Sequence, residues 1–438
     1  MEENQGGEKK IKLWNKDFFL LWQGQLVSYL GDVIYSFALS FWVLNVTGST
    51  ALMGILQAAS MAPRLIIGPF AGVLVDKWDR KKIIVIADVI RGVLSTFVGI
   101  AALSGFLEVW MVFVVGVVTS VCSAFFNPAI TSVKPDIVDK SKLVKANSVT
   151  SLAQAGASSL GSAVSGVIYV VVGAPYMFLF DGISYLFSAF TEMFISIPNI
   201  KRNNGEVTFI EDFKSGLSFV WNFKALRNMF IISCGLNFFF NAAFVLMLPL
   251  FNEASYLGAE KYGFLMAMSS VGMIIGSGLL SVVNIKNNKR YLIIVGTFLP
   301  MAMLFLLIPI VNNYYIILAV ATISFALNIM GNTIFDSVLM TIIPEEKRGK
   351  VFALINTFSM GLTPLGLAVG GILGEILPIR IAMLILLCCT LLLTLAFAFI
   401  KGLRPMINFD PEVEDVETLI TRTNKISDGE KSCQVAAD

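Results

Sequence analysis

Long apolar stretches separated by short polar segments dominate this chain. Twelve of these stretches are each long enough for the roughly 20 residues that an α-helix needs to cross a bilayer. The pattern therefore predicts an all-α membrane protein with twelve transmembrane helices. We expect these helices at about 18–44, 51–75, 83–103, 109–132, 147–172, 176–197, 229–251, 262–284, 290–311, 314–343, 351–376 and 379–400.

Longer polar segments divide the chain into parts. A basic N-terminus, 1–16, precedes a first set of six helices in 17–198, and a polar linker at 199–228 precedes the second set in 229–401. The tail at 402–438 is acidic and poor in large apolar residues, so we expect it to be disordered. In the linker, one face of an amphipathic helix is expected to lie on the inner membrane surface. The residues of that face are Phe209, Phe213, Leu217 and Val220.

An internal repeat supports two halves of six helices. The segment 160–166 reads LGSAVSG and the segment 365–371 reads LGLAVGG, in the fifth and eleventh predicted helices. Six helices per half give both copies the same orientation in the membrane, as a parallel repeat requires. The small residues in both copies are also expected in closely packed helices.

The basic residues assign a side to each predicted loop. Of the 32 Lys and Arg residues, only Lys261 and Arg380 fall in predicted outer loops, and only Arg64 and Arg91 fall within helices. The other 28 fall in segments on one side, which the positive-inside rule assigns to the cytoplasm. We therefore expect a multi-pass protein of the cell membrane with both termini cytoplasmic.

Composition narrows the classes of function. The chain is 56% hydrophobic and 14% charged, whereas a soluble domain has about 25% charged residues. A net charge of +2 gives no case for a nucleic-acid partner. Histidine is absent, the five cysteines lack metal-site spacing, and no Gly-x-x-x-x-Gly-Lys-Ser/Thr sequence occurs. We expect no metal, no cofactor and no enzymatic activity.

The turn between the second and third helices carries an ordered set of residues. Asp76 to Lys82 holds four basic and two acidic residues, which a positive-inside loop explains only in part. Gly72, Asp76 and Arg80 recur at a four-residue step, so a helix would place them on one face. Gly72 would allow a close helix neighbour and Arg80 would reach a carboxylate, which predicts a cytoplasmic gate.

The pattern Gly-x-x-x-Asp-x-x-x-Arg-Lys resembles the loop signature of the major facilitator superfamily, with Asp79 where that signature usually has a second glycine. Beyond the turn, the chain looks most like the drug-exporting branch that includes macrolide-efflux proteins and some siderophore exporters. The stretches that carry this resemblance are Trp22–Asp32, Asn127–Ala129 and Pro344–Phe352.

The resemblance implies the major facilitator fold and a monomeric secondary transporter with a small-molecule substrate. It implies proton-coupled export of an amphiphilic drug or antibiotic by alternating access. Transport of a native metabolite, siderophore or lipid is the alternative, and a membrane scaffold or sensor without transport is a remote one. The fifth helix lacks the proline that exporters of the superfamily often carry there. The fourth helix lacks the internal arginine that is typical of many proton-driven drug antiporters.

Ionisable residues within the helices are the candidates for coupling, because burying charge in lipid is expensive. Asp32 and Arg64 lie at matching depths, roughly 20 Å from the outer ends of adjacent helices. They are either a structural ion pair or a carboxylate that exchanges its proton as the pair opens. Asp181 is either a substrate contact or a hydrated rim residue.

Other polar residues form spaced pairs. Asp88 and Arg91, three residues apart, are expected to pair and to belong to the gate. Glu192 and Asp336 are expected at the inner gate or rim. Two pairs of amides at a four-residue spacing either bond neighbouring helices or line a substrate cavity. These are Asn237 with Asn241 and Asn328 with Asn332.

The orientation can be tested with single cysteines at Lys9, Lys81 and Lys425 in a cysteine-free variant. We expect all three to resist an impermeant thiol reagent in intact cells, and a cysteine at Lys261 to react as the outer control. Labelling of the first three from outside would reverse the topology.

Overall fold

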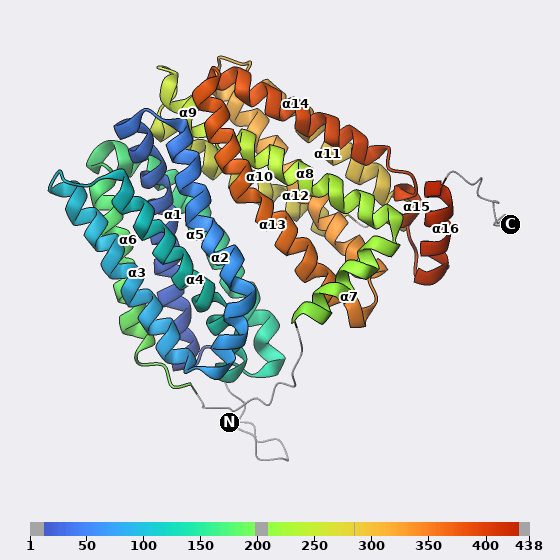
Figure 1. Ribbon diagram of the computed structural model, residues 1–438, viewed down its shortest axis with the longest axis horizontal. Coiled ribbons are helices and arrows are strands. Elements are labelled where there is room, and N and C mark those ends of the chain that lie inside the picture. Colours follow the sequence, from blue (N-terminus) through green and yellow to red (C-terminus); the bar gives the residue numbers. More distant parts are fainter. Residues whose placement is uncertain (1–12, 198–208, 284, 429–438) are drawn as a thin grey trace, which may run out of the picture. The chain divides into compact units, whose positions relative to one another are not determined.

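The computed structural model describes residues 13–197, 209–283 and 285–428, and these residues are almost entirely helical (Figure 1). Asn15 and Asp79 begin two of the membrane helices by accepting backbone N–H groups with their side chains. The membrane helices of the first set are α1 (Lys16–Thr47), α2 (Thr50–Lys77), α3 (Arg80–Leu103), α4 (Val109–Ile137), α5 (Leu143–Val172) and α6 (Ala174–Glu192).

The second set begins with a helix in the linker, α7 (Phe209–Asn222). The predicted seventh membrane helix is divided into α8 (Lys224–Phe244) and the short α9 (Met247–Glu253). The others are α10 (Ala259–Val282), α11 (Arg290–Leu307), α12 (Tyr314–Ile342), α13 (Glu345–Ile376), α14 (Ile379–Ala398), α15 (Leu403–Ile407) and α16 (Val416–Asp428).

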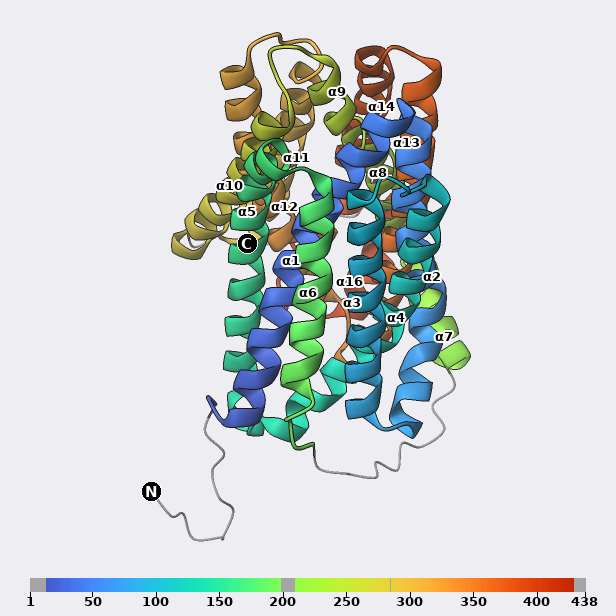
Figure 2. The same ribbon diagram turned by 90° about the vertical axis from the view of Figure 1, so that its left-hand side faces the viewer.

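Eleven helical spans in the described residues are long and apolar enough to cross a membrane. Of the twelve predicted membrane helices, α6 is the one that is not among these spans. Its 19 residues include Asp181, Tyr185 and Glu192. These polar residues face neighbouring helices, since all three are buried, and Figure 2 shows α6 between α1 and α3. Counting α6, the chain has the expected twelve membrane helices.

The chain divides into two compact units, one built from α1 to α6 and the other from α7 to α16. Two short segments are exchanged: Thr50–Ile55 of α2 belongs to the second unit and Leu257–Ala267 of α10 belongs to the first. The internal repeat makes equivalent contacts in the two units. A Cβ on Gly166 would lie 3.0 Å from Cα of Glu260, and one on Gly371 would lie 3.0 Å from Cα of Gly54. Close helix packing explains these glycines.

The expectation of a disordered tail is wrong for the part of it that the structure describes. Helix α16 buries Leu419 and Thr423 completely. Asn424 joins α16 to the bend between α7 and α8, because its Oδ1 accepts the N–H of Lys224 at 2.9 Å and its Nδ2 donates to the carbonyl of Asn222 at 2.8 Å. Residues 429–438 lie outside the described residues.

The linker helix forms as predicted but packs differently. Val220 is fully buried and Leu217 packs beside it in the apolar core of the second unit, against residues of α8, α13 and α16. Helix α7 therefore covers the protein core of its own unit, where a position on the membrane surface was expected. The side chains of Phe209 and Phe213 lie outside the described residues.

Glycines set the close spacing of α6 against α1 and α3. A Cβ on Gly182 would lie 2.9 Å from the carbonyl oxygen of Gly92, and one on Gly31 would lie 3.2 Å from Cα of Asp181. Backbone atoms cannot move aside as a flexible side chain can, so these positions exclude larger residues.

We therefore expect Gly182→Ala to lower the melting temperature of the purified protein, with a loss of about 1–3 kcal/mol, the usual cost of overpacking a well-packed core. Gly156→Ala in α5 is the matched control, because a Cβ there would meet no described heavy atom within 4 Å. Equal melting temperatures for the two variants would show that the α3–α6 contact is not tight.

Candidate functional site

A polar cavity of about 340 Å³ lies within the first unit. Asp32 of α1, Arg64 of α2 and Asp181 of α6 all line it, together with a group of hydroxyl and amide side chains. Asp181 is only 1% exposed, so it is not the hydrated rim residue that was one of the two expectations. The other polar lining residues are Tyr35, Ser36, Ser40, Gln57, Ser60, Ser95, Thr119, Ser120, Ser123 and Tyr185.

Asp32 is held by a residue that was not among the candidates predicted from the sequence. The phenolic O–H of Tyr185 donates to the Asp32 carboxylate, and Arg91 Nη1 donates to the same phenolic oxygen at 3.3 Å. Within the described part of the chain, Asp32 and Arg64 form no ion pair, so the predicted direct contact is absent. Arg64 instead presents an exposed guanidinium to the cavity that it shares with Asp32.

Arg91 is at the centre of the buried polar groups of this unit. It is 5% exposed and forms an ion pair with the fully buried Asp88, the i,i+3 contact that the sequence predicted. Its guanidinium carbon lies 4.2 Å from the ring centroid of Phe126 and 4.6 Å from that of Tyr185, and its Nε donates to the carbonyl of Ala87 at 3.3 Å. These contacts connect Arg91 to Asp32 through Tyr185.

A second buried ion pair joins the turn between α2 and α3 to the end of α4. Arg80 Nη1 lies 3.0 Å from Asp136 Oδ2 near the end of α4, and both side chains are at most 9% exposed. Asp79, the departure from the superfamily signature, caps α3 by accepting the N–H of Lys82 at 3.3 Å.

The close helix neighbour expected at Gly72 is absent, because a Cβ there would meet no described heavy atom within 4 Å. Gly72 therefore does not set a helix contact in this structure. The side chain of Asp76, the third predicted gate residue, lies outside the described residues.

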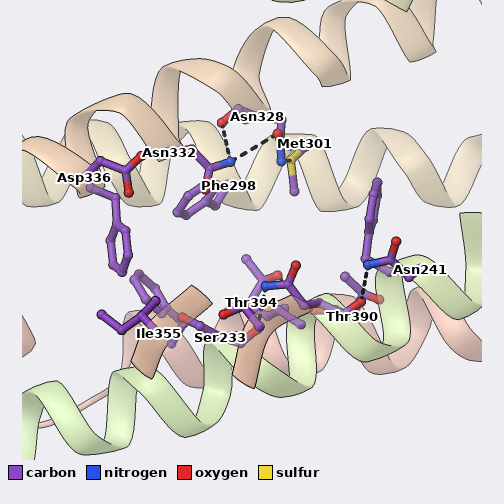
Figure 3. A pocket seen from close by; sticks show the side chains of 16 residues that line it. Ser233, Asn241, Phe298, Met301, Asn328, Asn332, Asp336, Ile355, Thr390 and Thr394 are labelled. Atoms are coloured by element: carbon purple, nitrogen blue, oxygen red, sulfur yellow. Dashed lines mark hydrogen bonds between the residues drawn. The ribbon is translucent and has the colours of Figure 1, made fainter. Parts of the chain in front are cut away.

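A second cavity, of about 390 Å³, lies within the second unit (Figure 3). Asn237 and Asn241 of α8 and Asn328 and Asn332 of α12 all line it. Figure 3 places Asn328, Asn332 and Asp336 along one side and Ser233, Thr390 and Thr394 along the other. The apolar lining includes Leu236, Phe240, Phe298, Met301, Phe335, Ile355 and Phe397.

The amides of this cavity bond mainly within their own helices. Asn241 Nδ2 donates to the carbonyl of Asn237 at 2.7 Å, and Asn332 Nδ2 donates to that of Asn328 at 2.9 Å. The contact of Asn328 Nδ2 with the Met301 sulfur, at 3.3 Å, joins two helices. Cross-helix bonding was one of the two expectations for these residues. It does not account for Asn237, Asn241 and Asn332, which keep hydrogen-bonding capacity directed at the cavity.

The two cavities differ in chemistry. The first contains two carboxyl groups and a guanidinium, whereas the second contains four amides, several aromatic rings and one carboxyl group, that of Asp336. Among the described residues, no group of three or more His, Cys, Asp or Glu side chains is placed to hold a metal ion. Proton exchange suits the first cavity, and an adaptable amphiphilic ligand suits the second.

Tyr185, the residue that connects Asp32 to Arg91, was not among the residues predicted from the sequence. A signal was available, because Tyr185 follows Asp181 by four residues and precedes Glu192 by seven, so all three share one face of α6. A polar stripe of this kind on an apolar helix indicates a buried polar contact.

Comparisons with known proteins agree with this fold. The chain matches the model of the family described as transmembrane secretion effector over residues 12–420. It is 26% identical to macrolide efflux protein A of Streptococcus pyogenes, over 91% of this chain and 98% of that protein. It is 23% identical to the staphyloferrin A transporter of Staphylococcus aureus, over 85% of this chain and 93% of that protein.

Solved transporter structures show the same fold at low sequence identity. The nucleoside transporter NupG aligns with a TM-score of 0.66 and 14% identity, over 87% of this chain and 100% of that one. A bacterial homologue of the iron transporter ferroportin aligns with a TM-score of 0.64 and 15% identity, over 88% and 99%. The chain therefore belongs to the transmembrane secretion effector family, a family of multi-pass membrane transporters in the major facilitator superfamily.

Proposed function

We propose that this protein is a secondary active transporter that exports an amphiphilic drug or antibiotic in exchange for protons, by alternating access. Its substrate is a small molecule and the protein works as a monomer in the cell membrane, with both termini in the cytoplasm. Macrolide efflux protein A, its relative over nearly the full length, supports export of this class of compound.

The observation that carries the proposal is the position of Asp32. A carboxyl group within a membrane helix must be paired, hydrated or neutral. Asp32 lines a polar cavity that it shares with Arg64, and among the described residues one phenolic hydroxyl, that of Tyr185, bonds it. A change of shape that breaks the Tyr185 contact leaves Asp32 to take a proton or to pair with Arg64. Alternation between these states is the minimum requirement for coupling a proton gradient to a moving cavity.

The cavity of the second unit supports an amphiphilic substrate. Aromatic rings supply apolar contact area, and Asn237, Asn241, Asn328 and Asn332 supply donors and acceptors without a fixed charge. Such a lining accommodates compounds of different shape, because amides rotate and carry both kinds of hydrogen-bonding group.

A second candidate is export of an anionic native metabolite such as a siderophore. The exposed Arg64 guanidinium in the first cavity favours it, since arginine binds carboxylates in bidentate geometry. The name of one relative, the staphyloferrin A transporter, points the same way. A panel of macrolides, amphiphilic cations and polycarboxylate chelators, measured by thermal shift of the purified protein, separates the two. Stabilisation only by the chelators would overturn drug export.

We expect Asp32→Asn to abolish transport driven by a pH gradient in proteoliposomes while leaving substrate binding largely intact. An amide cannot release a proton, but it still bonds the Tyr185 hydroxyl. Glu108→Gln, at the exposed N-cap of α4, is the control. If a stable Asp32→Asn protein still couples to the gradient, Asp32 is not the coupling carboxyl.

The Arg80–Asp136 ion pair of the proposed gate can be tested separately. Arg80→Ala is expected to slow transport at matched expression, because the ion pair with Asp136 holds the bases of α3 and α4 together. Exchanging the charges, with Arg80→Asp and Asp136→Arg in one chain, should restore part of the rate that either substitution alone loses. Equal rates in the wild type and in all variants would leave the Arg80–Asp136 pair without a role in gating.

A further inference from the structure

Asp88, Ser188 and Glu192 form a second buried acidic group in the first unit, outside the cavity. Each of the three is at most 1% exposed. Asp88 belongs to α3 and the other two to α6, and the side chains of Ser188 and Glu192 face the Asp88 carboxyl group. The sequence had suggested only a gate or rim position for Glu192, but the structure buries it against α3.

Several polar atoms of this group have no hydrogen-bond partner among the described residues. They are Asp88 Oδ2, both carboxyl oxygens of Glu192 and the hydroxyl of Ser188. Buried polar atoms without partners cost about 1–3 kcal/mol each, and more when charged. A carboxylate only accepts hydrogen bonds, so two ionised carboxyl groups that face each other cannot satisfy one another.

One added proton would give each of these buried polar atoms a hydrogen-bond partner. The Asp88 carboxyl is ion-paired with Arg91 through Oδ1, so it is the group that stays ionised. A proton on Glu192 turns that side chain into an O–H donor to Asp88 Oδ2, and the Ser188 hydroxyl then donates to the remaining Glu192 oxygen. Two carboxyl groups that share a site and one cation retain one proton between them for the same reason.

We propose that Asp88 and Glu192 share one proton and form a second proton-binding site of this transporter, coupled to Asp32 through Arg91. The proposal rests on proton-coupled transport. The site lies near the end of α6 that the basic-residue distribution assigns to the cytoplasm, and seven residues separate Glu192 from Tyr185, about 10 Å along the helix.

Arg91 couples the two sites because both use its guanidinium. It contacts Asp88 directly and reaches Asp32 through the Tyr185 hydroxyl. Loss of the proton from Glu192 adds a negative charge beside Asp88, draws Arg91 toward that pair and weakens its hold on Tyr185. Asp32 is then freed to take a proton from the cavity, so the two sites are filled in alternation.

Few other charged or titratable groups surround the pair. Helix α3 contributes Arg91, α4 contributes Cys122, α1 contributes Asp32, and α6 itself contributes Tyr185 and Asp181. Arg91 is the one buried cation of this group within the described residues, against the buried Asp88, Asp181 and Glu192 and the half-buried Asp32. With Arg64 in the cavity, two guanidinium groups face four carboxyl groups, so charge balance favours protons on the excess acids.

The first test detects the proton itself, in the full-length protein in lipid nanodiscs at neutral pH. Infrared spectroscopy should show the C=O band of a protonated carboxyl group that Glu192→Gln removes and Glu108→Gln leaves in place. Glu192→Gln should keep the wild-type melting temperature within a few degrees, because its amide N–H replaces the O–H donor to Asp88. Glu192→Ala should melt lower.

A protonated-carboxyl band that is unchanged in Glu192→Gln would overturn the shared proton. Added sodium or potassium chloride that raises the melting temperature of the wild type but not of Glu192→Gln would also overturn it, in favour of a metal cation. If Glu192→Gln does not fold, Asp88→Asn serves as the second variant and should remove the same band.

The second test separates this site from Asp32. In proteoliposomes, Glu192→Gln should flatten the pH profile of transport while substrate binding stays at the wild-type level. A wild-type pH profile in Glu192→Gln, with coupling lost in Asp32→Asn, would confine coupling to Asp32 and overturn the second site. If both variants keep the wild-type profile, neither Asp32 nor Glu192 couples protons to transport, whereas the infrared result still decides whether the pair holds a proton.

Discussion

The burial of Arg91 is the interaction on which the first unit depends. A guanidinium inside a membrane protein is costly unless every face of it is occupied. The guanidinium of Arg91 contacts Asp88, Tyr185, the carbonyl of Ala87 and the ring of Phe126. These groups come from α3, α4 and α6, so one charge fixes the mutual positions of three helices. Removing any partner leaves a buried charge poorly compensated.

Close backbone packing makes these contacts possible. The phenol of Tyr185 reaches both Arg91 and Asp32 because α6 lies against α3 at Gly92 and Gly182 and against α1 at Gly31. Larger residues at these glycines would separate the helices and move donors away from acceptors. The glycines therefore allow the short distances between helices at which the polar side chains can form their hydrogen bonds and ion pairs.

Sequence patterns predicted most of the fold, because the length and apolarity of a membrane helix are local properties. The Asp88–Arg91 pair and the four cavity amides were also accessible, since helical spacing alone brings their side chains together. The partner of Asp32 could not be predicted from the sequence, because the choice between Arg64 and Tyr185 depends on how α6 packs against α1. Helix α16 was missed because few of its side chains are apolar, and Asn424 holds it through contacts with residues about 200 positions away.

The same close packing limits how the first unit can respond to a proton. Helices in contact at glycine backbones cannot slide past one another without steric overlap, and packed interfaces change between discrete arrangements rather than continuously. In the proposed mechanism, a proton gained or lost at Asp32 therefore acts first on side chains, and Arg91 and Tyr185 are the pair whose bonds extend to both acidic groups. In this mechanism, a change of charge at one acidic group reaches the other through these two side chains, without displacing α6.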